Sequence, residues 1–141
     1  MKLPDVNVLI YAFRAGTPHH QICKMWLDQR VRGDEAFAIS NQVLSAVVRI
    51  ATNRRLFEAP SPRDEAFAFC RDIISQDHCR IVEPGPRHWA IFEKLCRETE
   101  TSGARVTDAW FAALAIEHGC EWVTLDRDFA RFPELNWTAP A

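Results

Sequence analysis

Short apolar segments alternate with longer helical patterns along the whole of this 141-residue chain. Strands that are joined through helices run parallel, because the helix returns the chain to the same end of the sheet, whereas a tight turn connects antiparallel strands. The predicted strands span residues 2–5, 36–39, 79–83 and 121–126, with a small last strand around Trp137. This order predicts an α/β fold: a three-layer α/β/α sandwich with a mostly parallel sheet of about five strands, connected by right-handed crossovers.

The segments between these strands carry apolar residues at helical spacing. Helices are predicted over 19–33, from Asn41, from Ser61, from Arg87, and over 106–119 with Gly119 as C-cap. In the first of these helices, the residues expected to share the apolar side are Ile22, Met25, Trp26 and Leu27. Trp26, Trp89 and Trp110 all fall in apolar helical patterns, so they are expected in the core rather than at a binding surface.

Size and composition indicate one ordinary globular domain covering residues 1–141. No apolar run reaches the roughly 18 residues needed to span a bilayer, so no membrane association is expected. The N-terminal segment lacks the pattern of a signal peptide, which favours a cytoplasmic protein. Five cysteines without a C-x-x-C pair favour core packing over a zinc site or a disulfide framework. A net charge of −2 gives no general case for nucleic-acid binding.

Aspartates fall at one predicted edge of the sheet. Asp5 ends the first strand and Asp126 ends the fourth, with Asp128 close behind. Asp108 is near the start of a buried helix whose N-terminal end faces the same edge. Ligands of open parallel sheets bind beyond the carboxyl ends of the strands. We therefore expect Asp5, Asp108 and Asp126 to meet at one mouth.

Each of these aspartates has a simpler explanation when it is taken alone. Asp5, Asp108 and Asp128 each stand where a helix N-cap is favourable, and Asp126 suits a turn. A set of like charges on one rim is different, because the carboxylates raise one another's pKa unless a cation neutralises them. Hard oxygen ligands without Cys or His are suited to Mg²⁺ or Mn²⁺. The set therefore predicts a site for one of these divalent ions.

Long segments of the sequence resemble a known family. "LPDVNVLIYAF" and "VTDAWFAALAIEHGCEWVTLDRDFARFP" are similar to PIN-domain ribonucleases, specifically VapC-type toxins, and "VLSAVVRIATNRRLF" extends the resemblance through the middle of the chain. The resemblance implies a PIN-like fold, Mg²⁺- or Mn²⁺-dependent cleavage of structured RNA such as tRNA or rRNA, neutralisation by a VapB-type antitoxin, and a homodimer. Family catalytic and metal positions carry over to Asp5, Asp108 and Asp126, with Asp128 as a second-rank metal ligand.

The resemblance also bears on the polar residues around these aspartates. Asn7 and Thr124 match neighbouring positions that are expected to hydrogen-bond the carboxylates or the substrate. The family pattern has a Glu in the helix after the second strand, where this chain has Ala46. Ser40 and Asn41 remain nearby as neutral ligands or as anchors for a metal-bound water. A site of three or four Asp is expected to bind one ion well and a second one weakly.

Arginines near the mouth are expected to position substrate phosphates. By sequence proximity alone, the candidates are Arg14, Arg49, Arg105 and Arg127. Two other functions compete with a nuclease. A catalytically weakened PIN-like module that binds RNA or a partner would explain Ala46, although the retained acids count against it. A receiver-like phosphotransfer domain would need a Lys beside an aspartyl nucleophile, and no Lys of this chain ends a late strand.

Overall fold

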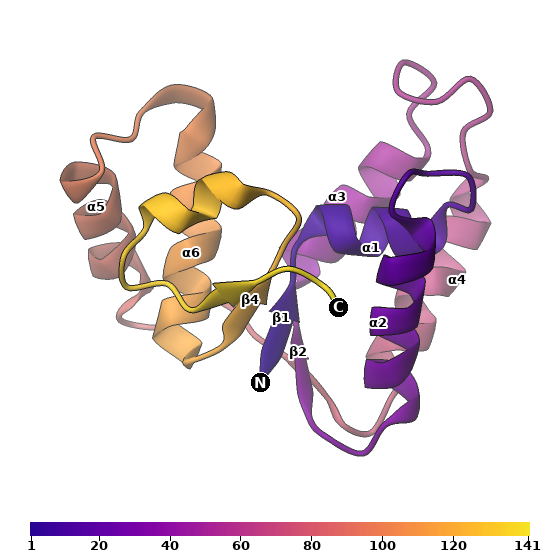
Figure 1. Ribbon diagram of the computed structural model, residues 1–141, viewed down its shortest axis with the longest axis horizontal. Coiled ribbons are helices and arrows are strands. Elements are labelled where there is room, and N and C mark those ends of the chain that lie inside the picture. Colours follow the sequence, from indigo (N-terminus) through magenta and orange to yellow (C-terminus); the bar gives the residue numbers. More distant parts are fainter.

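The computed structural model describes residues 1–141 and contains all five predicted strands (Figure 1). In chain order the elements are β1 (Lys2–Pro4), α1 (Val6–Phe13), α2 (His20–Arg32), β2 (Phe37–Ile39), α3 (Asn41–Ala51), α4 (Arg63–Ile74), β3 (Cys79–Ile81), α5 (His88–Glu98), the 3₁₀ helix η1 (Gly103–Arg105), α6 (Val106–His118), β4 (Glu121–Val123), the 3₁₀ helix η2 (Arg127–Arg131) and β5 (Trp137–Thr138).

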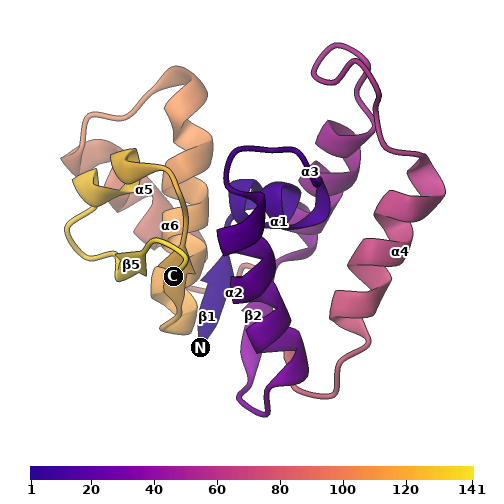
Figure 2. The same cartoon turned by 45° about the vertical axis from the view of Figure 1, so that its right-hand side comes forward.

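The strands pair only in parallel, which confirms the predicted topology. β4 lies between β1 and β5, and Trp122 of β4 is opposite both Leu3 and Trp137. β2 pairs with β3, with Ala38 opposite Arg80. β1 and β2 lie side by side in both views without a hydrogen-bonded ladder between them (Figure 1; Figure 2). The strands are thus bonded as a three-stranded and a two-stranded sheet rather than as one continuous five-stranded sheet.

Pro4 explains why the ladder stops between β1 and β2. The Asp5 N–H donates to the carbonyl of Val123, so the odd-numbered residues of this segment face β4. Successive residues of a strand point their N–H groups to opposite sides, so position 4 faces β2. Proline has no N–H to donate there, and a strand of three residues has few other donors.

The helices cover the strands from two sides. In both views α5 and α6 lie on one side of β1 and β2, and α1 to α4 lie on the other (Figure 1; Figure 2). α5 packs against α6, while α1 packs against α2 and α3. This arrangement confirms the predicted three-layer sandwich. No helix combines the length and the apolar character that a membrane crossing requires.

Helix α1 follows β1 after a single residue. Its sequence, VNVLIYAF, is rich in β-branched and aromatic residues, which are only moderate helix formers. Burial decides the outcome, because Val8, Leu9 and Ile10 are all in the core. The fold therefore turns the chain from strand to helix at Asp5, directly at the carboxyl end of the sheet.

The predicted apolar side of α2 was partly wrong. Trp26 and Leu27 are buried, but Ile22 and Met25 are exposed, and Cys23 takes a place in the core. The packed side is narrow because α2 contacts the rest of the protein mainly through α1. Trp89 of α5 was also expected in the core, yet 67% of its surface is exposed.

Two local predictions were correct. Gly119 ends α6 with φ of 63°, the left-handed conformation that glycine adopts without strain. Three cysteines, Cys23, Cys70 and Cys120, are buried, in line with their predicted role in packing, while Cys79 and Cys96 are half-buried.

Candidate functional site

Asp5 stands where β1 ends and α1 begins. It is the N-cap of α1, and the Val6 N–H donates to its Oδ1 at 2.6 Å. Its second oxygen, Oδ2, accepts from the Thr124 hydroxyl at 2.7 Å and from Nδ2 of Asn7 at 3.3 Å. The residue is only 9% exposed. Helix capping therefore accounts for Oδ1 alone, while two polar side chains hold Oδ2.

Asn7 and Thr124 tie the start of α1 to the end of β4. The Thr124 hydroxyl accepts from Asn7 Nδ2 at 3.2 Å and from the Asp126 N–H at 3.0 Å, in addition to its donation to Asp5. The Leu125 N–H donates to Oδ1 of Asn7 at 3.2 Å. The buried hydroxyl thus uses its one donor and both acceptor positions. This network restricts the Asp5 side chain to one orientation.

The carboxylates of Asp108 and Asp126 lie near Asp5 and affect its protonation. Burial raises the pKa of Asp5 to about 6, the hydrogen bonds from Thr124 and Val6 oppose that rise, and the charges of Asp108 and Asp126 add to it. Burial also raises the pKa of Asp108, against the opposing charge of Arg131. Three acids from β1, α6 and the end of β4 therefore share one electrostatic environment.

Two arginines neutralise part of this acidic group. Arg131 Nη2 lies 3.5 Å from Oδ2 of Asp108, and Arg105 Nη1 lies 2.9 Å from Oδ2 of Asp128. The Arg131 guanidinium stacks on Phe132 at 4.6 Å, and its Nε and Nη1 are buried without hydrogen-bond partners. Sequence reasoning missed Arg131, because the segment RDFARFP contains no signal that distinguishes it from Arg127.

The aspartate carboxylates suit a hard divalent ion, although they do not converge on one point. No three His, Cys, Asp or Glu side chains lie close enough together to bind the same ion. Asp108 and Asp128 are each drawn toward an arginine, while Asp126 accepts from the Asp128 N–H at 2.9 Å. Carboxylate oxygens without sulfur or imidazole fit Mg²⁺ or Mn²⁺. Convergence on an ion requires the arginine pairs to open.

Ser40 and Asn41, which follow β2, were expected to be neutral ligands but have other contacts in the structure. The Ser40 hydroxyl caps α3 by accepting from the Val43 N–H at 3.4 Å. Asn41 is exposed and lines a groove between α3 and α4. Neither side chain hydrogen-bonds to the carboxylates described above. Ala46 is half-buried in the second turn of α3, and α3 itself contains no Asp or Glu.

The four arginines proposed from the sequence differ in their surroundings. Arg14 is held by Ser61 Oγ at 2.8 Å and by the ring of Phe57 at 3.7 Å. Arg105 pairs with Asp128, and Arg49 lines the groove between α3 and α4. Arg127 is exposed, and its guanidinium forms no hydrogen bond or ion pair within the chain. Arg49 and Arg127 are therefore both free of partners, and of the two it is Arg127 that lies beside Thr124 and the site.

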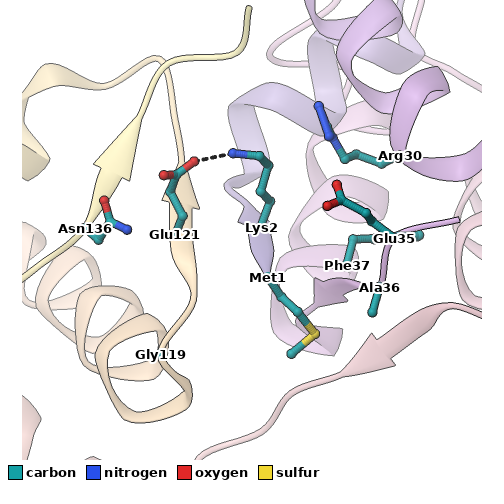
Figure 3. A pocket seen from close by; sticks show the side chains of 9 residues that line it. All are labelled: Met1, Lys2, Arg30, Glu35, Ala36, Phe37, Gly119, Glu121 and Asn136. Atoms are coloured by element: carbon teal, nitrogen blue, oxygen red, sulfur yellow. Dashed lines mark hydrogen bonds and ion pairs between the residues drawn. The ribbon is translucent and has the colours of Figure 1, made fainter. Parts of the chain in front are cut away.

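Two cavities lie at opposite ends of the strands. One, of about 470 Å³, adjoins the carboxylates and includes Thr124 and Arg127 in its lining. The other, of about 400 Å³, lies at the amino-terminal end, where Lys2 and Glu121 form an ion pair across β1 and β4 (Figure 3). None of the aspartates of the candidate site lines this second cavity.

Comparison with known proteins identifies the family to which this fold belongs. The sequence model of the PIN domain family matches residues 2–135 of this chain. Ribonuclease VapC31 of Mycobacterium tuberculosis is 45% identical over 140 residues, which cover 99% of each chain. The crystal structure of VapBC2 from Rickettsia felis bound to a promoter DNA fragment superposes with a TM-score of 0.71 at 18% identity, covering 98% of this chain and 97% of that one. A toxin–antitoxin complex from Klebsiella pneumoniae superposes with a TM-score of 0.65 at 20% identity, covering 100% and 98%. The chain therefore belongs to the PIN domain family.

Proposed function

We propose that this protein is a Mg²⁺- or Mn²⁺-dependent endoribonuclease that cleaves structured RNA such as tRNA or rRNA. One observation carries the proposal: the buried carboxylate of Asp5 is held at the carboxyl end of the sheet beside Asp108 and Asp126. Burial and the neighbouring carboxylates raise the pKa values of Asp5 and Asp108, and acids grouped in this way favour a bound cation. The similarity to a protein named a ribonuclease, over 99% of both chains, supports the same activity.

Asp5, Asp108 and Asp126 would hold the ion, with Asp128 as a second-rank ligand. The bound ion would supply the chemistry of phosphodiester hydrolysis, by lowering the pKa of a water molecule and neutralising charge on the phosphate. The chain's part is to present the ligands, and Thr124 and Asn7 do this by fixing Oδ2 of Asp5. With Ala46 in place of an acid, one ion is bound well and a second one weakly.

The arginines on the acidic group have a part in this scheme. Binding of an ion by Asp108 would open its 3.5 Å contact with Arg131. The released guanidinium would then stand beside the reacting phosphate, where an arginine forms two parallel charge-assisted hydrogen bonds. Arg131 would in this way hold Asp108 while the site is free of metal and contact the substrate once metal is bound.

The proposal is tested by cleavage of total tRNA and rRNA, with the new ends mapped. Wild-type protein should cleave RNA in the presence of Mg²⁺ or Mn²⁺, and addition of EDTA should stop the cleavage. Asp108→Asn should lower the rate of RNA cleavage by more than about 100-fold. Loss of a contact that only supports a metal ligand already lowers metal affinity or activity by about 10- to 100-fold. The matched control is Asp34→Asn, an exposed aspartate in the loop before β2 without a side-chain partner. Undiminished cleavage by metal-stripped protein, or by folded Asp108→Asn, would refute the assignment.

We further propose that a VapB-type antitoxin neutralises the protein by covering the acidic mouth with an arginine. Such a side chain would compete with metal for the carboxylates, as Arg131 and Arg105 do within the chain. The close similarity to a VapC protein supports this partner. Co-expression with the neighbouring reading frame should give a complex and suppress RNA cleavage. Full cleavage in the presence of that gene product would count against it.

A binding module without catalysis is the second candidate function. Two observations favour it: no acid stands at Ala46, and no three acidic side chains converge on one point. This alternative predicts RNA or partner binding by folded protein with no cleavage at any metal concentration. Metal-dependent cleavage that disappears in Asp108→Asn would exclude it.

A further inference from the structure

The cavity of about 470 Å³ beside the carboxylates has a composition suited to a nucleotide. It lies beyond the carboxyl ends of β4 and β5, and its lining includes His19, Thr124, Arg127 and Trp137. Its volume falls within the roughly 300–1,000 Å³ of small-ligand sites. The cavity thus combines two aromatic rings and a cation beside the candidate active site.

The aromatic groups of this cavity are available to a ligand. Trp137 is half-buried and lines the cavity, so part of its surface is accessible there. His19 is exposed, and its ring centroid lies 5.5 Å from that of Tyr11. Aromatic rings that line a groove stack on nucleobases irrespective of base identity, because every base has a π-face.

Arg127 supplies the charge that a nucleotide needs. Its guanidinium has no partner within the chain, whereas Arg105 and Arg131 are paired with Asp128 and Asp108. A free guanidinium binds a phosphate through two parallel hydrogen bonds. Base stacking and phosphate binding are therefore both possible within one cavity.

The cavity shares a wall with the carboxylates. Thr124 lines it and donates to Oδ2 of Asp5 at 2.7 Å, and Asp126 lies in the chain between Leu125 and Arg127, which are also in the lining. A nucleotide bound here would be separated from the carboxylates by a single side chain. Its neighbouring phosphate would lie at the proposed point of cleavage.

We propose that this cavity binds the nucleotide next to the scissile phosphate of a single-stranded RNA segment, with Trp137 stacking on the base and Arg127 binding a phosphate. The inference rests on the proposed nuclease function, whose substrate it specifies. Stacking and backbone contacts are tolerant of sequence, so the subsite selects an unpaired nucleotide rather than a particular base.

The test measures binding of a short labelled single-stranded RNA to the Asp108→Asn protein, in which cleavage does not interfere. Trp137→Ala should weaken binding by about 5- to 150-fold, the range for loss of one base–aromatic stack. Trp137→Phe should restore most of the affinity. Arg127→Gln should weaken binding and lower the slope of log K against log salt by about 1. The matched control is Trp89→Ala, which removes an exposed tryptophan on α5 outside the cavity and should leave binding unchanged.

The outcomes separate the two proposals. Binding that depends on Trp137 without any cleavage by the wild-type protein would refute the nuclease and leave the subsite. Cleavage by a wild-type protein whose RNA binding is equal in Trp137→Ala and Trp89→Ala would overturn the subsite and leave the nuclease. Absence of binding to single-stranded RNA by folded protein would also overturn it. If Trp137→Ala misfolds in a thermal melt, the exposed Arg127→Gln decides in its place, and binding equal to that of the parent Asp108→Asn protein would overturn the subsite.

Where cleavage is observed, an abasic nucleotide gives a second test. Placed beside the cleaved bond, it should lower kcat/KM of the wild-type protein and have little further effect in Trp137→Ala, because the two changes remove the same stack. Independent, additive losses would show that Trp137 does not contact that base.

Discussion

Replacing Asp5 by Asn should stabilise the metal-free protein at neutral pH while it abolishes RNA cleavage. The carboxylate is 9% exposed, and burial is the main reason that its pKa rises from 3.8 to about 6. A raised pKa for an acid means that the folded state binds the proton more tightly than the unfolded state. The free energy of unfolding therefore falls as pH rises from about 4 to about 6, and the loss is complete above that range.

The size of the effect follows from the shift. A rise of about two pKa units corresponds to about 3 kcal/mol lost at pH 8, at 1.36 kcal/mol per unit. Asn is neutral at all pH values and avoids this loss. An Asn side chain whose oxygen takes the position of Oδ2 keeps the bonds from Thr124 and Asn7. Its Nδ2 then faces the Val6 N–H, and loss of that capping bond costs about 1–2 kcal/mol. The net gain at pH 8 is then about 1–2 kcal/mol, and it should disappear near pH 5 and become a small loss near pH 4.

Urea unfolding in EDTA, from pH 4 to 8, measures this difference between variant and wild type. Asp34→Asn serves again as the control, since its exposed side chain contacts nothing. Addition of Mg²⁺ should reverse the order of stability, because an ion that binds only the folded wild type stabilises it by mass action. A variant less stable than wild type in EDTA at pH 8, or a difference independent of pH, would refute the argument from burial.

Two further predictions concern residues around the carboxylates. Ala46→Glu should lower the metal concentration that cleavage requires. The matched control is Ser45→Glu, which lies on the exposed side of α3 in the groove with α4 and should leave that concentration unchanged. A metal titration of RNA cleavage compares the two variants. Equal titrations for both variants would show that position 46 does not reach the ion. Arg131→Met should tighten Mg²⁺ binding in the absence of RNA, because the ion no longer displaces the Arg131 guanidinium from Asp108. The free energy of unfolding should change little, because the substitution also removes Nε and Nη1, two buried donors without partners. Isothermal titration and urea unfolding measure the two effects, and weaker Mg²⁺ binding would contradict the proposed competition.

Much of the fold and part of the candidate site were predictable from sequence because they depend on local order. Alternating strands and helices determined the parallel arrangement, since connections of this length exclude hairpins. Gly119 and Ser40 end and begin helices through their own conformational and hydrogen-bonding properties. Asp5 follows a short apolar strand, and residues in that position of a parallel sheet face the ligand-binding edge.

What the sequence could not determine depends on which side chains meet in space. The contact of Arg131 with Asp108, the groove position of Asn41 and the exposure of Trp89 all follow from helix rotations of a fraction of a turn. Hydrophobic periodicity predicts that a helix has a buried side, but its exact direction is set by the neighbouring helices, as Ile22 and Met25 of α2 illustrate. The cavity formed by His19, Arg127 and Trp137 joins the loop before α2 to the C-terminal segment, which lies far away in the chain. No local pattern encodes such a meeting, because only the packing of the whole chain brings these segments together.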